Sequence, residues 1–179
     1  DHVWEVGCSS ANYSCSSSAT QYPDLNEIPW ELLTKNTLIK LFHRGQVPYQ
    51  NKVIIDAIGT ALEPIVLLGI PNAEGDRPII TGQSATSRTQ LPNYIGQGKG
   101  VVTIGQAGAT TEAPAYIVLD NLDIRDGRDS LTYTNTAGQT QNYEPYVAAV
   151  NIKSGHHITV RNCIIKNSDQ GLVTGNGSS

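Results

Sequence analysis

From residue 37 onward, short apolar runs alternate with clusters of Gly, Pro, Asn and Asp. Short runs rich in β-branched residues and bounded by turn residues are typical of β-strands. The pattern predicts strands at residues 38–42, 53–57, 64–69, 78–81, 101–104, 116–119, 122–124, 147–152, 158–160, 163–165 and 172–174. These strands are too numerous and too short for a doubly wound α/β sheet, so we predict an all-β fold.

One segment before these strands has a helical pattern. Residues 24–33 form a short apolar patch that begins with Asp24, an N-cap residue, and Glu27 stands three residues later as in a capping box. Pro29 would interrupt a longer helix, because it lacks a backbone N–H. We therefore predict a short helix of one or two turns that caps the N-terminal end of the fold.

The predicted strands repeat along the chain. Residues 116–125 (YIVLDNLDIR) align with residues 157–166 (HITVRNCIIK), so that apolar positions coincide at 117/158, 119/160, 122/163 and 124/165. Residues 150–152 align with residues 172–174, about 22 residues later. A period of this size indicates one turn of a parallel β-solenoid, and the longer spacing of the first pair is then one turn plus an insertion at residues 127–144.

The alignment also places Asn121 on Asn162. A strand, a one- or two-residue corner and another strand need a corner residue that tolerates left-handed backbone geometry, which Asn does. Stacked Asn side chains can also hydrogen-bond from one coil to the next. We predict a structural Asn ladder at these two positions; the alternative is two unrelated turn residues.

Residues 155–172 (GHHITVRNCIIKNSDQGL) resemble the repeat of right-handed parallel β-helix proteins of the pectate-lyase-like superfamily. Residues 52–69 (KVIIDAIGTALEPIVLLG) and 77–82 (RPIITG) are similar to the N-terminal coils of the chondroitinase B and alginate lyase group, in which a short helix caps the open end. The resemblance spans about residues 25–174. It implies a right-handed parallel β-helix at residues 37–179, preceded by an N-terminal segment and helical cap at residues 1–36.

The resemblance also directs attention to one sheet, because the first parallel sheet and the loops beside it usually form the saccharide groove in this superfamily. Strand alternation places Val150 and Ile152 inward and leaves Asn151 and Lys153 outward. Neighbouring coils would add Thr103, together with the pair Lys52 and Asp56, to the same face.

A polysaccharide lyase needs a base that removes a proton beside a uronate carboxylate and a cation that neutralises that carboxylate. Lys153 and Arg161 are the candidate cations, and His156 and His157 the candidate proton carriers. The alternative is a solvated lysine, an arginine on another face and a polar corner. No motif here matches the catalytic Lys and Arg or the calcium ligands of the chondroitinase B and alginate lyase group.

Two polar insertions, residues 83–100 and 127–144, carry tyrosines that offer flat stacking faces to sugar rings or to a partner. Tyr133 and Tyr143 therefore join Asn151 and Thr103 as candidate substrate-binding residues. The alternative is that these insertions only decorate the surface.

The net charge of the chain and the positions of its acidic residues limit the classes of ligand that the sequence supports. The chain has 12 Lys and Arg against 16 Asp and Glu, a net charge of -4, whereas nucleic-acid binders usually carry a basic patch, so we expect no nucleic-acid partner. The sequence indicates no cofactor. The series Asp120, Asp123, Asp126 and Asp129 leaves a bound Ca²⁺ open, against the alternative of ordinary solvated carboxylates, since hard cations need several oxygens in one small site.

The cysteines and the chain ends suggest where the protein works. Cys8 and Cys15 lie close together in a Ser-rich stretch and match no zinc pattern, so we expect a local disulfide, with two free thiols as the alternative. The chain begins at Asp1 and contains no Met, which favours a processed, exported protein, either secreted, on the cell surface or in the periplasm. The last coil has barely begun at Ser179, so we expect a C-terminal continuation, a partner chain or self-association there, rather than a self-sufficient domain.

Two functions compete. The first is an exported β-helix protein that acts on or binds a polysaccharide, by a lyase-like mechanism if the polysaccharide is acidic. The second is a non-catalytic structural or adhesive solenoid, such as a filament, surface or assembly component. The sequence does not decide whether the protein is an enzyme, because the fold is shared by lyases, hydrolases, epimerases, adhesins and structural proteins.

Overall fold

The protein is described by a computed structural model at residues 2–9, 13–90, 96–105 and 112–175. It is nearly all-β, with parallel strands arranged in stacked sheets. The helical elements of the described residues are three single 3₁₀ turns, η1 (Leu25–Glu27), η2 (Trp30–Leu32) and η3 (Gln97–Lys99). No helix in this part of the chain is long and apolar enough to cross a membrane.

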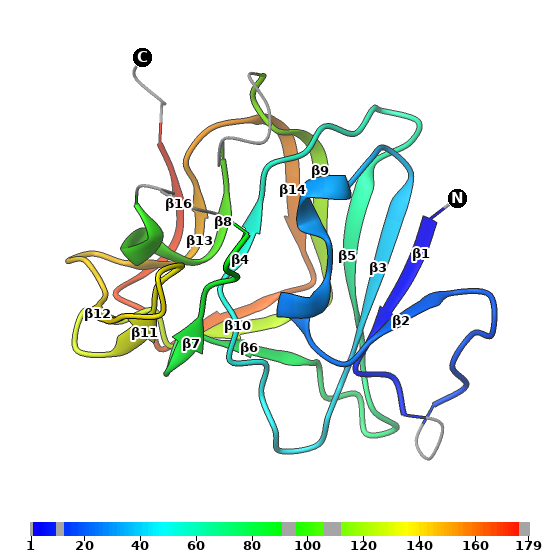
Figure 1. Cartoon of the computed structure of the whole chain (residues 1–179), viewed down its shortest axis with the longest axis horizontal. Helices are drawn as coiled ribbons and strands as arrows, with labels where there is room; N and C mark the ends of the chain where they lie inside the picture. Colours follow the sequence, from blue (N-terminus) through cyan, green and yellow to red (C-terminus); the bar gives the residue numbers. More distant parts are fainter. Residues whose placement is uncertain (1, 10–12, 91–95, 106–111, 176–179) are drawn as a thin grey trace.

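Three parallel sheets form the body of the molecule, and strands from distant parts of the sequence lie side by side in each (Figure 1). Sheet A has the order β14 (His156–Arg161), β9 (Ala115–Asp120), β5 (Ile65–Ile70), β3 (Thr37–Phe42), β1 (His2–Val6), β2 (Thr20–Tyr22). Sheet B has the order β15 (Ile164–Lys166), β10 (Asp123–Arg125), β6 (Ile79–Thr81). Sheet D has the order β16 (Gln170–Thr174), β13 (Ala148–Ile152), β8 (Gly100–Ile104), β4 (Val53–Ile55).

A smaller sheet, C, lies where the two insertions meet. It contains β7 (Ala85–Thr86), which pairs in parallel with β11 (Thr132–Thr134), and β12 (Thr140–Asn142), which forms an antiparallel hairpin with β11. The chain visits sheets A, B and D in turn and then returns to A, so each circuit adds a strand beside that of the preceding circuit. This arrangement is compatible with a β-helix or a similar solenoid.

The register of the strands confirms the two repeat alignments made from the sequence. Ile117 pairs with Ile158 in sheet A, and Ile124 pairs with Ile165 in sheet B. In sheet D, residues 150–152 pair with residues 172–174. Each predicted strand is present, with bounds that differ from the prediction by up to two residues.

Asn121 and Asn162 occupy the corner between sheets A and B in successive circuits, and both have left-handed backbones, with φ of 58° and 53°. Asn121 Nδ2 donates to Gly69 O at 2.9 Å, and Asn162 Nδ2 donates to Asp120 Oδ1 at 2.9 Å. Each asparagine therefore bonds to the preceding circuit, but its partner is a carbonyl or a carboxylate rather than the other asparagine. The approach is so close that a Cβ on Gly69 would lie 2.0 Å from Asn121 O.

The predicted capping helix was wrong in type, because residues 24–33 form the 3₁₀ turns η1 and η2 rather than an α-helix. The Asp24 side chain accepts a hydrogen bond from the backbone N of the next residue, Leu25. In a capping box the N-cap side chain would instead accept from the backbone N of the third residue of the helix. Pro29 separates the two turns and cannot donate a backbone hydrogen bond, which limits each turn to three residues.

Five strands were not expected from the sequence: β1, β2, β7, β11 and β12. Most are two or three residues long and polar, as in the β2 sequence TQY, so they carry no alternating apolar signal. In β1 the buried residue Glu5 interrupts the apolar pattern. Its carboxylate accepts hydrogen bonds from Ser16 N at 2.9 Å and Gln21 Nε2 at 2.8 Å, and it pairs with Lys40.

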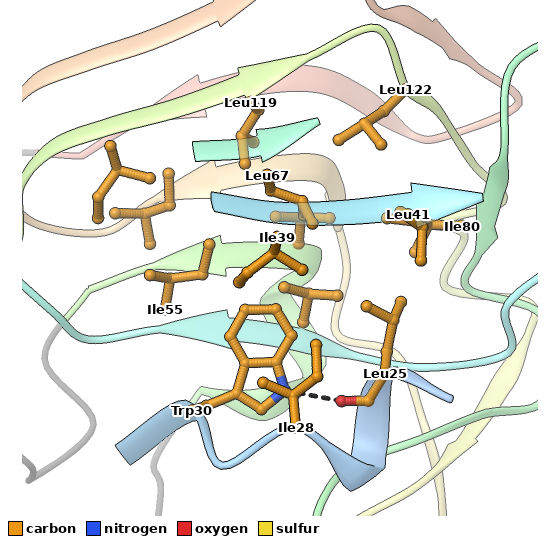
Figure 2. Packing of buried hydrophobic residues seen from close by; sticks show 14 of the residues in the cluster. Leu25, Ile28, Trp30, Ile39, Leu41, Ile55, Leu67, Ile80, Leu119 and Leu122 are labelled. Atoms are coloured by element: carbon orange, nitrogen blue, oxygen red, sulfur yellow. Dashed lines mark hydrogen bonds between the residues drawn. The ribbon is translucent and has the colours of Figure 1, made fainter. Parts of the chain in front are cut away.

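The inward side chains of sheets A, B and D form one apolar core, and the turns η1 and η2 cover its N-terminal end (Figure 2). Leu25, Ile28 and Trp30 are each at least 98% buried against this core. Trp30 Nε1 donates to Leu25 O at 2.8 Å, so the one polar atom of the ring is satisfied while its faces pack on apolar neighbours.

We expect Trp30→Ala to lower the free energy of unfolding by about 3–5 kcal/mol, because it opens a cavity over the end of the core. Leu32→Ala in the same turn is the matched control, since Leu32 is 69% exposed and its truncation should change stability by less than about 0.5 kcal/mol. Urea denaturation of both variants measures the difference, and equal losses would contradict a capping role for Trp30.

Candidate functional site

The four candidate catalytic residues are distributed over two ends of one strand and a neighbouring turn. Lys153 follows β13 and is exposed, His156 and His157 begin β14, and Arg161 ends it. Because a strand advances about 3.3 Å per residue, Arg161 lies roughly 13–17 Å from the histidines along β14. The structure therefore does not bring all four side chains together, and their catalytic roles stay a prediction.

Arg161 is engaged with a carboxylate of the neighbouring strand. Its Nε donates to Asp120 Oδ2 at 2.9 Å, while Asn162 bonds to the other oxygen of that carboxylate. Burial would raise the pKa of Asp120, but the hydrogen bonds from Asn162 and Arg161 and the charge of Arg161 outweigh it and lower the pKa below its usual value. Asp120 thus remains ionised and links the corner at Asn162 to Arg161.

The outer face of sheet D, expected to form the saccharide groove, is partly covered. Asn151 pairs with Thr103, which in turn pairs with Ile54, as alternation predicted. Thr103 and Ile54 are at most 2% exposed, and Arg88 Nη1 from the first insertion donates to Ile54 O at 2.9 Å. Toward the β16 edge this face is accessible to solvent, at Asn151, Lys153 and Val173. The substrate-binding roles of Asn151 and Thr103 stay a prediction.

Tyr133 and Tyr143 lie together, but their rings surround a lysine. Lys52 Nζ lies 4.5 Å from the Tyr133 ring centroid and 4.4 Å from that of Tyr143, and it donates to Gly100 O. Both tyrosines are at most 7% exposed, and Tyr143 Oη donates to Gly82 O at 2.8 Å. These contacts attach the insertion that carries the β11–β12 hairpin to sheet D; a role of the two tyrosines in sugar binding stays a prediction.

Lys52 is an uncommon residue because it is almost fully buried and forms no salt bridge with a carboxylate among the described residues. Burial disfavours its charged form and lowers its pKa to about 7, and the more distant charge of Glu144 opposes the shift only in part. The two tyrosine rings and the Gly100 carbonyl also stabilise the ammonium form. Burial likewise raises the pKa of both tyrosines, so they stay protonated around it.

The outer face of sheet B carries two adjoining cavities that the sequence reasoning did not identify. One has a volume of about 300 Å³ and the other about 240 Å³, and both are lined by Gln46, Ile79 and Arg125. Strand register sets the outward side chains in two rows across the sheet, which are Ile79–Asp123–Ile164 and Thr81–Arg125–Lys166. The alignment of residues 116–125 with 157–166, which superposes Arg125 on Lys166, was the signal that could have found the second row.

Asp123 organises the charges of this groove. Arg125 Nε donates to Asp123 Oδ1 at 2.9 Å, Arg125 Nη2 donates to Asp123 Oδ2, and Lys166 Nζ lies 3.2 Å from the same carboxylate. The hydrogen bond to Asp123 raises the pKa of Arg125. One carboxylate that is 4% exposed thus holds two cations at the mouth of the groove.

Three of the four acidic residues considered for calcium have separate partners. Asp120 bonds to Arg161 and Asn162, Asp123 to Arg125, and Asp126 Oδ2 accepts from Thr81 Oγ1 at 2.7 Å. Among the described residues, the one group of three close metal-ligand side chains is Glu5, Cys8 and Cys15, and the two cysteines form a disulfide.

The predicted Cys8–Cys15 bridge is thereby confirmed, and such bridges are typical of a non-reducing environment.

Comparisons with known proteins found no matching family model, no matching curated protein and no matching solved structure.

We expect Lys52 to make stability depend on pH. Its pKa of about 7 in the folded state is below the ordinary 10.5, so between these values the unfolded chain binds more protons and the free energy of unfolding rises with pH. In Lys52→Met this contribution, at most about 1.4 kcal/mol per pH unit, should disappear. Denaturant titrations between about pH 7 and pH 9.5 measure it. Lys35→Met, which removes an exposed lysine, should keep the slope of the wild type, and a Lys52→Met slope equal to that of the wild type would contradict the assignment.

Proposed function

We propose that the protein is an exported right-handed parallel β-helix that binds an acidic polysaccharide along the outer face of sheet B. The observation that carries this proposal is the row of cations held in register across successive circuits, beside two joined cavities. A groove that crosses parallel strands about 4.8 Å apart offers similar contacts at successive steps. An extended polymer with a repeated acidic group matches such a surface.

The charge of the groove supports an anionic ligand. The larger cavity is lined by three cationic side chains, Arg77, Arg125 and Lys166, and by two carboxylates, although the chain as a whole has a net charge of -4. The smaller cavity adds Asp126, whose carboxylate accepts from Thr81. The groove is thus less acidic than the protein around it.

The donors of the groove also support this proposal. The bonds to Asp123 use two of the five guanidinium N–H groups of Arg125 and one of the three ammonium N–H groups of Lys166. The remaining N–H groups suit uronate carboxylates, because guanidinium and carboxylate form paired hydrogen bonds. Ile79 and Ile164 line the same cavity and offer apolar surface to the carbon-bound hydrogens of a sugar ring.

Binding is a better-supported proposal than lyase catalysis. Arg161 is bound to Asp120 at the end of β14 opposite to the histidines, so this candidate cation and the histidine bases do not share one site. The sheet B groove holds cations and carboxylates in mutual ion pairs, which suits recognition of a charged polymer. Export agrees with the disulfide between Cys8 and Cys15.

We expect Arg125→Gln to raise the dissociation constant for polygalacturonate by about 10- to 100-fold, because a hydrogen bond between charged groups contributes about 1.5–3 kcal/mol. Calorimetric titration measures the constant, and a neutral glucan should bind weakly to wild type and variant alike. Lys166→Gln provides a second variant in the same row and should also weaken binding.

Lys153→Gln is the discriminating control, because Lys153 belongs to the face of sheet D. It should leave polygalacturonate affinity unchanged. If Lys153→Gln abolished binding while Arg125→Gln did not, the ligand would bind at sheet D and the proposal for sheet B would be overturned.

A second candidate function, a structural component that assembles through its C-terminal circuit, is favoured by one specific observation. The inward side chain of Leu172 is 44% exposed, whereas its partner Val150 in the preceding circuit is completely buried. The strands β14, β15 and β16 each lie at the edge of their sheet. Because η1 and η2 cover the other end of the core, we propose that two copies associate through their C-terminal circuits in a two-fold symmetric pair.

This assembly predicts a dimer in which Leu172 is buried. Sedimentation equilibrium over a wide range of protein concentration should show dimers for the wild type and monomers for Leu172→Lys. Leu62→Lys, at a position that is 94% exposed, is the matched control and should dimerise like the wild type. A wild type that remains monomeric throughout this range would overturn the assembly proposal.

A further inference from the structure

His156 and His157 lie unusually close for consecutive residues of a strand. Their Nδ1 atoms are 2.7 Å apart, and both side chains are exposed. Consecutive side chains of a regular strand point to opposite faces, so two neighbours cannot normally meet. Here they meet because His157 has a left-handed backbone with φ of 56° and Gly155 before the pair has φ of 130°.

A tyrosine of the neighbouring circuit fixes the orientation of the pair. The rings of Tyr116 and His157 are stacked, with centroids 4.4 Å apart and an interplanar angle of 11°. Tyr116 also has a left-handed backbone, with φ of 52°, so the same local conformation recurs on both strands. The ring of His156 stands edge-on to both of these rings.

This arrangement holds two imidazole nitrogens at the separation that a metal ion requires. Metal–nitrogen bonds in proteins are about 2.0–2.1 Å, so two ligands at right angles around one ion are about 2.9 Å apart. The observed separation of 2.7 Å is close to this value, and binding requires the two rings to rotate so that both Nδ1 lone pairs converge on one ion. We propose that His156 and His157 bind a divalent transition-metal ion through their Nδ1 atoms.

The proton arrangement is consistent with this chemistry. Without metal, a hydrogen bond between two neutral imidazoles requires one Nδ1 to carry a proton and the other to accept it. With metal, both Nδ1 lone pairs bind the ion, and the displaced proton is carried by Nε2 of the same ring. Because both side chains are exposed, water can occupy the other coordination positions of the ion. The ring that carried its proton on Nδ1 carries it on Nε2 instead, so no proton is released overall.

The ligand type defines which ions suit the site. Imidazole suits Zn²⁺, Cu²⁺ and Ni²⁺, whereas Ca²⁺ and Mg²⁺ prefer oxygen ligands. Among these ions, the general order of affinities places Cu²⁺ first. The inference is independent of polysaccharide binding, because it uses β14 and β9 of sheet A, whereas the proposed groove lies on sheet B.

The test is a titration of untagged wild-type protein with Cu²⁺ and with Zn²⁺, followed by calorimetry and, for Cu²⁺, by electron paramagnetic resonance. We expect one ion per chain and a copper spectrum with two nitrogen ligands. His157→Phe keeps an aromatic ring against Tyr116 while removing the nitrogen, and His156→Ala removes the other ligand. Each should weaken binding by at least the roughly tenfold that the loss of an outer-shell partner of a metal ligand costs.

Three outcomes would overturn the proposed metal site. The wild-type protein would bind neither ion, both histidine variants would keep the wild-type affinity, or Ca²⁺ would bind as tightly as Cu²⁺. His2→Gln is the matched control, since it removes an exposed histidine from another strand and should leave the affinity unchanged. Tyr116→Leu, which removes the stacked ring but keeps both ligands, should weaken binding less than either histidine variant.

Discussion

The pairing of each circuit with the preceding one, in constant register, is the constraint on which the rest of the structure depends. In sheet A alone, Ile65, Ile117 and Ile158 lie opposite one another on three successive circuits. Because side chains alternate along a strand, this register sends one set of aligned residues, such as these three isoleucines, into the core and the residues between them outward. A slip of one residue would reverse both faces at once.

The same constraint explains the close approach at the corners. Asn121 can bond to Gly69 O only because the left-handed corner brings the two backbones together, and Gly69 lacks the Cβ that would collide with it. It also explains why functional groups form rows. Arg125 and Lys166 are 41 residues apart in the sequence, yet register makes them neighbours that share Asp123.

Periodic features of the fold could be predicted from the sequence, whereas contacts made by the insertions could not. The aligned positions at 117/158 and 124/165 predicted the true strand partners, because inward residues must be apolar on every circuit. Lys52 was expected on an open face by alternation. Its burial depends on Tyr133 and Tyr143, which come from another circuit. The residues next to Lys52 in the sequence do not indicate that contact.

The candidate site residues show the same difference between periodic features, which could be predicted, and contacts of irregular segments, which could not. Asn151 and Thr103 are adjacent, as register required, but the covering of Thr103 by the first insertion could not be read from spacing. The meeting of His156 with His157 depends on a positive φ, which the sequence HH does not signal. Sequence periodicity therefore located the strands and their faces, while the exposure of each face was decided by irregular segments.

The corner between sheets B and D shows how freely chain length can vary without disturbing this register. It takes three residues between β15 and β16, residues 167–169, but 22 residues between β10 and β13, residues 126–147. Closing the longer loop costs only about 2 kcal/mol more, because closure entropy grows with the logarithm of loop length. This corner is therefore a natural place to graft a foreign peptide, since the next strand resumes the same register after either a short or a long connection.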